Sequence, residues 1–168
     1  MRFADDLFAQ AQHLLTHDWR RPKQASLRRV ISTAYYAIFQ LLIEESARRM
    51  TGNANKPLRQ QAQRGFDHGA MRQCCRSFGG GSLPEVVASL LTMPLSAPLR
   101  TVARRFALLQ DARHDADYDA SRIYTRADAE AFVRHAEEAF AAWKTVRGTD
   151  EARVFLVTLL PWKSWNRT

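Results

Sequence analysis

Cysteine is nearly absent from this chain of 168 residues, and the two that occur, Cys74 and Cys75, are neighbours. Adjacent cysteines rarely bond to each other and do not make a disulfide framework, which excludes the class of small disulfide-stabilised domains. No spacing of cysteine and histidine resembles a zinc site. The sequence therefore predicts a reduced protein that holds no metal and no bound cofactor.

Long apolar runs are missing as well. The longest, residues 154–160, is interrupted by Thr158 and is far too short to cross a bilayer. The first six residues carry two acids and no apolar region, so we expect no signal peptide. The glycine triplet at 79–81 is not followed by Gly-Lys-Ser/Thr, which excludes a phosphate-binding P-loop. We expect a cytoplasmic protein without a membrane partner.

Lysine is scarce, whereas arginine is abundant. Only four of the 25 basic residues are lysines, and with 17 acidic residues the net charge is +8. The guanidinium fork binds phosphate through two N–H groups, so this excess predicts a polyanionic partner such as RNA or a nucleotide. The alternative is a codon bias toward arginine and alanine, which gives the same charge without any such partner.

Apolar residues recur at spacings of three and four through most of the chain, which is typical of helices. The pattern predicts helices over 3–17, 26–50, 66–78, 98–116 and 125–147, with a short one through Leu91 opened by a capping box from Ser82 to Glu85. A second box, Thr125 to Asp128, opens the 125–147 helix. The polar stretch 51–63 is predicted to be a loop. The fold class is therefore an all-α bundle of five or six helices.

The domain organisation predicted here is one helical domain over 1–148 and a tail over 149–168. Val154 to Val157 form a β-like run in this tail, and Pro161, Trp162 and Trp165 follow. The pattern leaves open whether the tail is a strand, a helix or an arm that binds a partner.

The predicted helix 26–50 has the widest apolar arc. One stripe is accompanied by a second that includes Tyr36, Phe39 and Ile43. Such a helix is either the centre of a bundle or half of a subunit interface. We expect a homodimer, with an interface on the order of 2,000 Å² or more. Tyr35 and Tyr36 are interpreted as core packing.

Arg113 stands at the end of another apolar stripe, formed by Leu99, Val102, Phe106 and Leu109. A guanidinium keeps its charge, so at a buried position it needs acceptors or an anionic ligand. Asp117 is one candidate, because positions i and i+4 share a helix face. One reading is an Arg–Asp pair that fixes the end of the helix, and the other is an anion site.

Several stretches together resemble HEPN domains, the helical "higher eukaryotes and prokaryotes nucleotide-binding" family. They are the sequence RVISTAYYAIF at 29–39, His68-Gly69 before a short helix, the pattern Arg-x-x-Ala-Asp-Tyr at 113–118, and the box at 125–128. The resemblance implies a helical bundle that pairs as a homodimer. It also implies RNA-cleaving toxins or phage-defence effectors, often with a nucleotidyltransferase-type antitoxin, or else inert nucleotide-binding or scaffolding modules.

In active nucleases of this family, an arginine and a histidine four to six residues later meet at the dimer cleft. Arg113 matches that arginine, but Tyr118 stands where the histidine is expected. Metal-free RNA cleavage needs a base, an acid and a cation. On this resemblance we expect Arg113 to supply the cation, Tyr118 a hydrogen bond or a proton, and His114 or His68 the base, in a cleft lined by Arg113, His114, Asp117 and Tyr118. The alternative is that His114 is a solvated residue at the helix end and that His68 is a capping or packing residue.

The function expected from the sequence is therefore a metal-independent endoribonuclease with a composite site across a homodimer. Whether the chain is an enzyme is left open, because two alternatives stand beside this one. The first is a non-catalytic module in which Arg113 holds a nucleotide phosphate or only an internal carboxylate. The second is an interaction protein that docks a partner through residues 149–168.

Overall fold

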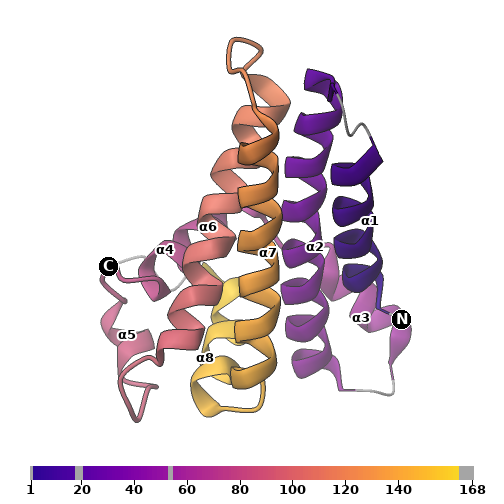
Figure 1. The fold of residues 1–168 in the computed structure, drawn as a ribbon. Helices are drawn as coiled ribbons and strands as arrows, with labels where there is room; N and C mark the ends of the chain where they lie inside the picture. The colour runs from indigo at the N-terminus through magenta and orange to yellow at the C-terminus, as the bar shows by residue number, and fades with distance from the viewer. Residues whose placement is uncertain (1, 18–20, 53–54, 163–168) are drawn as a thin grey trace.

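The computed structural model describes residues 2–17, 21–52 and 55–162, and every regular element in these ranges is an α-helix. The helices are α1 (Phe3–His17), α2 (Gln24–Thr51), α3 (Lys56–Gln63), α4 (His68–Phe78), α5 (Glu85–Ala88), α6 (Ala97–Tyr118), α7 (Arg126–Val146) and α8 (Asp150–Leu159) (Figure 1). The predicted all-α bundle is confirmed. The expected count of five or six helices is too low, because α3 and α8 did not show as helices in the sequence.

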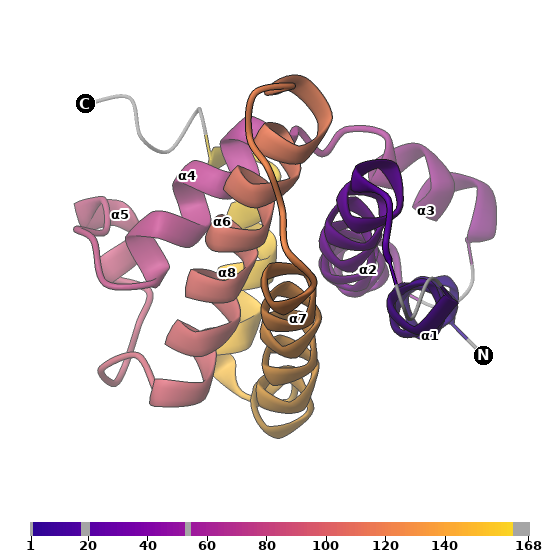
Figure 2. The same cartoon turned by 45° about the horizontal axis from the view of Figure 1, so that its top comes forward.

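Helix α2 is the centre of the bundle. It lies between α1 and α3 on one side and α6 and α7 on the other, and it also contacts α8 (Figure 2). Most of its two apolar stripes is covered within one chain: Ile31, Tyr35 and Leu42 have no exposed surface, Phe39 and Ile43 are also buried, and Tyr36 is half-buried. The width of its apolar arc is therefore explained by the bundle itself and gives no argument for a subunit interface.

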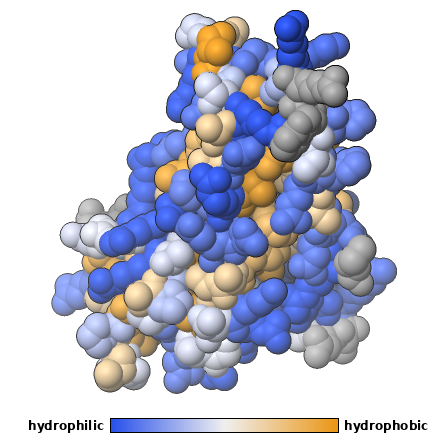
Figure 3. All heavy atoms as spheres, viewed as in Figure 1, coloured by the Kyte–Doolittle hydropathy of each residue, from blue (hydrophilic) through white to orange (hydrophobic). Residues whose placement is uncertain are grey.

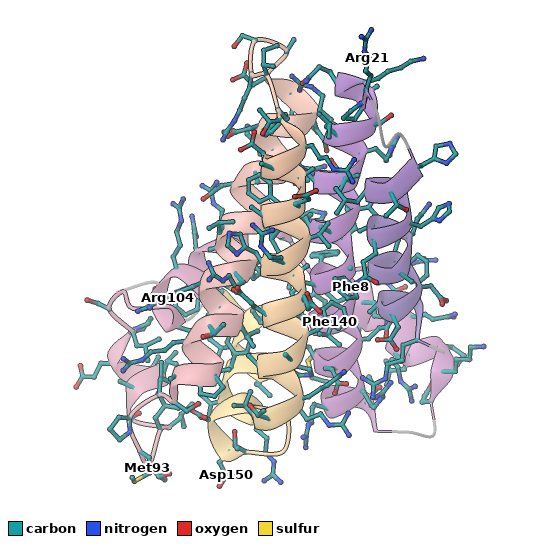
Figure 4. The ribbon with its side chains drawn as sticks, viewed as in Figure 1. Phe8, Arg21, Met93, Arg104, Phe140 and Asp150 are labelled. Atoms are coloured by element: carbon teal, nitrogen blue, oxygen red, sulfur yellow. The ribbon has the colours of Figure 1, made fainter. Side chains whose placement is uncertain are left out.

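Helices α1 and α7 meet beside α2. The rings of Phe8 and Phe140 stack there with their centroids 5.1 Å apart (Figure 4). The outer face on this side is mainly hydrophilic, with hydrophobic residues visible along the line between α7 and α2 and again around α5 (Figure 3). No helix in the described ranges has both the length and the apolar character needed to cross a membrane.

The first part of the predicted tail is a core helix. Thr149 caps α8 by accepting a hydrogen bond from the Ala152 amide, and the helix packs on α2 and α4. Phe155 has no exposed surface and meets Phe78 edge-on at 5.0 Å between centroids. Trp162 is also buried, whereas Trp165 lies outside the described residues. Residues 150–162 are thus neither a strand nor a free arm.

Two local predictions are wrong. Residues 56–63 form α3, not a loop, and this helix has no buried residue and hence no apolar stripe to reveal it. Ser82 does not cap α5, which begins at Glu85 after Pro84. The reason is that the residue before a proline, here Leu83, is disfavoured in helical conformation. The capping box at Thr125 and Asp128 is confirmed, with both reciprocal hydrogen bonds present.

Candidate functional site

The site is built where the first half of α2 runs antiparallel to the last turns of α6. Ser32 and Tyr36 are one turn apart on α2, and Arg113 and Asp117 are one turn apart on α6. The hydroxyl of Ser32 donates a 2.6 Å hydrogen bond to Oδ1 of Asp117, and Nη2 of Arg113 donates a 2.9 Å bond to the hydroxyl of Tyr36. The pair on α2 therefore contacts the pair on α6 through two hydrogen bonds across the helix interface.

Arg113 and Asp117 form the ion pair that their spacing predicts. Nε of Arg113 lies 2.8 Å from Oδ2 of Asp117, but its N–H is not aligned with an acceptor among the described residues, so the contact is electrostatic and not a good hydrogen bond. The side chain of Arg113 is 15% exposed and that of Asp117 is 30% exposed. Both side chains therefore keep some surface in contact with solvent.

Aromatic rings surround the guanidinium of Arg113. Its Cζ lies 5.5 Å from the ring centroid of Tyr36 and 5.6 Å from that of Tyr118. Burial tends to lower the pKa of Arg113, but the Tyr36 hydrogen bond and the charge of Asp117 outweigh it and raise the pKa above its usual value. The guanidinium therefore stays charged, and Asp117 supplies a negative charge beside it.

His68, the first residue of α4, is held against the same part of α2. Its ring stacks on Phe39 with centroids 4.2 Å apart, and its Nδ1 lies 2.6 Å from the hydroxyl of Tyr35. Tyr35 is fully buried, and this burial raises its pKa so that the phenol stays protonated. The bond to Tyr35 occupies Nδ1 and leaves Nε2 as the nitrogen that can meet a ligand.

Tyr36 connects the histidine to the arginine. The Tyr36 ring meets the His68 ring edge-on at 6.2 Å between centroids, while its hydroxyl binds Arg113. Burial, and then the positive charge of Arg113, lower the pKa of His68 below its ordinary 6.5, against the opposite effect of Asp67. At neutral pH, His68 is therefore an uncharged imidazole beside a guanidinium.

Among the described residues, His114 makes no ring contact or hydrogen bond with the row formed by His68, Tyr36 and Arg113. It is exposed, and its ring contacts that of Tyr118 at 5.1 Å between centroids. Tyr118 is itself 68% exposed, at the end of α6. Of the five residues singled out in the sequence, the structure brings Arg113, Asp117 and Tyr118 into contact and joins His68 to them through Tyr36. His114 lies at the edge of the group.

Three side chains of α2 belong to this site and were not predicted to: Ser32, Tyr35 and Tyr36. The sequence does hold one signal for the tyrosines, because a buried phenol usually has a hydrogen-bond partner for its hydroxyl. Tyr36 also lines a groove of about 390 Å³ between α1 and α2, together with Arg29 and Gln40. The site around Arg113 therefore adjoins a partly apolar groove through Tyr36.

The described residues include no group of three or more histidine, cysteine or acidic side chains placed to hold a metal ion. Cys74 and Cys75 are free thiols in the core, and burial raises the pKa of each, so both stay protonated. No model of a protein family, no curated protein and no solved structure matches this chain.

Proposed function

We propose that the chain is a HEPN-like, metal-independent endoribonuclease that acts as a toxin or defence effector, with Arg113 and His68 as its principal catalytic residues. The observation that carries the proposal is the row of Arg113, Tyr36 and His68, in which a charged guanidinium, a phenol and an uncharged imidazole adjoin one another. These are a cation, an acid and a base, the three groups that metal-free cleavage of RNA needs.

The cleavage step assigns one role to each group. To act as the base, His68 must accept the proton of a 2′-hydroxyl at Nε2, and this role requires its own proton to be on Nδ1, 2.6 Å from the oxygen of Tyr35. The 2′-oxygen forms a bond to the adjacent phosphorus, and the bond from phosphorus to the 5′-oxygen of the next nucleotide breaks. That oxygen takes a proton from the hydroxyl of Tyr36, whose oxygen already accepts from Arg113. The products are a 2′,3′-cyclic phosphate and a 5′-hydroxyl.

Arg113 stabilises the extra negative charge on the phosphorane. A guanidinium in a partly desolvated site is well suited to this, since the low local dielectric strengthens its attraction to phosphate oxygens. Tyr118, exposed over the same guanidinium, offers a ring on which a base can stack. The net charge of +8 attracts RNA to the protein.

Pairing of two chains is part of the proposal, and its support is the family resemblance. Each chain has its own cation and base. In a homodimer of the expected kind, two such sites would lie in one cleft. Light scattering at micromolar concentration tests the pairing, and a monomer there would remove the composite site while leaving the roles of Arg113 and His68 to be tested.

A second function is favoured by a specific contact. Asp117 accepts from Ser32 and neutralises part of the charge of Arg113, an arrangement that also suits a non-catalytic module in which Arg113 holds a phosphate group without turnover. Such a module would bind RNA or a nucleotide and leave it intact.

One experiment separates the two functions. A labelled single-stranded RNA is incubated with the protein in EDTA, beside the same RNA with every 2′-hydroxyl methylated. The nuclease cleaves the first RNA to cyclic-phosphate ends and leaves the methylated one intact, because the methyl group blocks the attacking oxygen. Binding of both RNAs without any cleavage would assign the module function.

A further inference from the structure

A second, larger hollow lies at the opposite end of α6, away from Arg113. It has a volume of about 700 Å³ and is bounded by the end of α4, the segment around α5 and the first turns of α6. Leu83, Leu91 and Leu95 supply apolar walls, while Thr92, Arg100 and Arg104 supply polar ones. This volume lies within the range of sites that bind small organic ligands.

The glycine triplet of the sequence shapes this pocket. Nε of Arg104 donates a hydrogen bond to the carbonyl of Gly79. A Cβ atom on Gly79 would lie 2.9 Å from Cγ of Arg104, and one on Gly80 would lie 3.1 Å from Nη2. Gly80 also has a φ of +137°, a conformation that other residues rarely adopt. The bare loop thus lets the guanidinium of Arg104 lie across it in a fixed orientation.

The charge of the pocket is not neutralised. Neither Arg100 nor Arg104 pairs with a carboxylate in the part of the chain that the structure describes. The next residue, Arg105, does pair, with Glu138 at 2.6 Å. None of the described residues that line the pocket is acidic. Two guanidinium groups one turn apart therefore line a hollow of mixed polar and apolar walls, where an anion is attracted and a cation is repelled.

We propose that this pocket binds a small organic anion that carries a phosphate or carboxylate group on an apolar body. The anionic group binds Arg100 and Arg104, and the apolar body lies along the partly exposed side chains of Leu83, Leu91 and Leu95. Figure 4 shows Arg104 and Met93 on the side of the molecule where α5 lies, and Met93 at the rim is 73% exposed. The pocket is separate from the proposed nuclease site, because Arg104 and Arg113 are nine residues, about 13 Å, apart along α6.

Calorimetric titration of the full chain tests the proposal with four probes: hexyl phosphate, octanoate, inorganic phosphate and hexanol. We expect one equivalent of hexyl phosphate or octanoate to bind, and the tighter of the two identifies the anionic group. Inorganic phosphate and hexanol should bind at least ~10-fold more weakly, because each lacks one half of the recognised chemistry. Equal binding of hexanol and both anions would overturn the proposal.

Three variants make the test specific. Arg104→Met should weaken binding of the preferred anion by ~10-fold or more. Arg100→Met, at an exposed side chain that pairs with no carboxylate among the described residues, should act in the same direction. The matched control is Arg134→Met on the exposed face of α7, which should bind as the parent chain does. Unchanged binding in both pocket variants, or an equal loss in Arg134→Met, would contradict the assignment.

Discussion

The hydroxyl of Tyr35, a side chain with no exposed surface, lies 2.6 Å from Nδ1 of His68. This bond orients the imidazole from inside the core. In Tyr35→Phe, the ring still fills its place but Nδ1 loses its partner, so we expect the free energy of unfolding to fall by about 1 kcal/mol. The rate of RNA cleavage should also fall, since the tautomer of His68 is no longer fixed. Nitrogen NMR of the imidazole should show the change in tautomer, and an unaltered His68 spectrum would contradict the positioning role.

The lowered pKa of His68 makes stability depend on pH. Between that folded-state pKa and the ordinary 6.5, the unfolded chain binds more protons than the folded chain, so the free energy of unfolding falls as the pH drops through this window. Below the folded pKa, the loss levels off. His135, whose pKa burial also lowers, adds to the same trend. Thermal melts from pH 8 to 5 should therefore show a shallower pH dependence in His68→Gln than in the parent chain, and an identical dependence would rule out the assignment.

The Ser32 hydroxyl supports the carboxylate of Asp117 at the α2–α6 interface. Ser32 is 4% exposed, and its 2.6 Å bond goes to a charged acceptor. We expect Ser32→Ala to lower the free energy of unfolding by roughly 1–3 kcal/mol in urea titrations. Ser82→Ala, at an exposed residue before α5, is a comparison outside this contact. A Ser32→Ala chain as stable as the parent would mean that the bond contributes nothing to the fold.

The helix that follows the 1–148 region carries part of the core. Phe155→Ala removes a ring with no exposed surface that packs on Phe78, and such truncations cost about 3–5 kcal/mol. Deletion of residues 149–168 removes α8 altogether and should leave a chain without a cooperative melting transition. A deletion variant that melts as sharply as the full chain would show that the rest of the fold does not need residues 149–168.

Much of the fold follows from apolar periodicity. The limits of α1 and the stripe that leads to Arg113 could be predicted because each helix buries one regular face. The pairing of Arg113 with Asp117 follows from their spacing on that helix. Helix α3 could not be predicted in this way, since it buries no residue and is fixed at its start by the Asn55 side chain, which accepts from the Leu58 amide.

The rest of the site depends on contacts between helices. Local spacing places His114 next to Arg113, yet it is His68, 45 positions earlier, that joins Arg113 through Tyr36. No periodicity within one helix can reveal that α4 brings its first residue against α2. The helical character of residues 150–159 was hidden for a related reason: a run of β-branched and aromatic residues is common to strands and to buried helices.

A comparison of two variants, each with one histidine replaced by glutamine, tests the account most directly. The rate of RNA cleavage in EDTA is measured for the parent chain, His68→Gln and His114→Gln, with melting temperatures to show that all three are folded. The account predicts a loss of about 10²–10⁴-fold for His68→Gln, as for removal of a general base, and a rate within about twofold of the parent for His114→Gln. The reverse order, or a parent chain that cleaves no RNA, would contradict it.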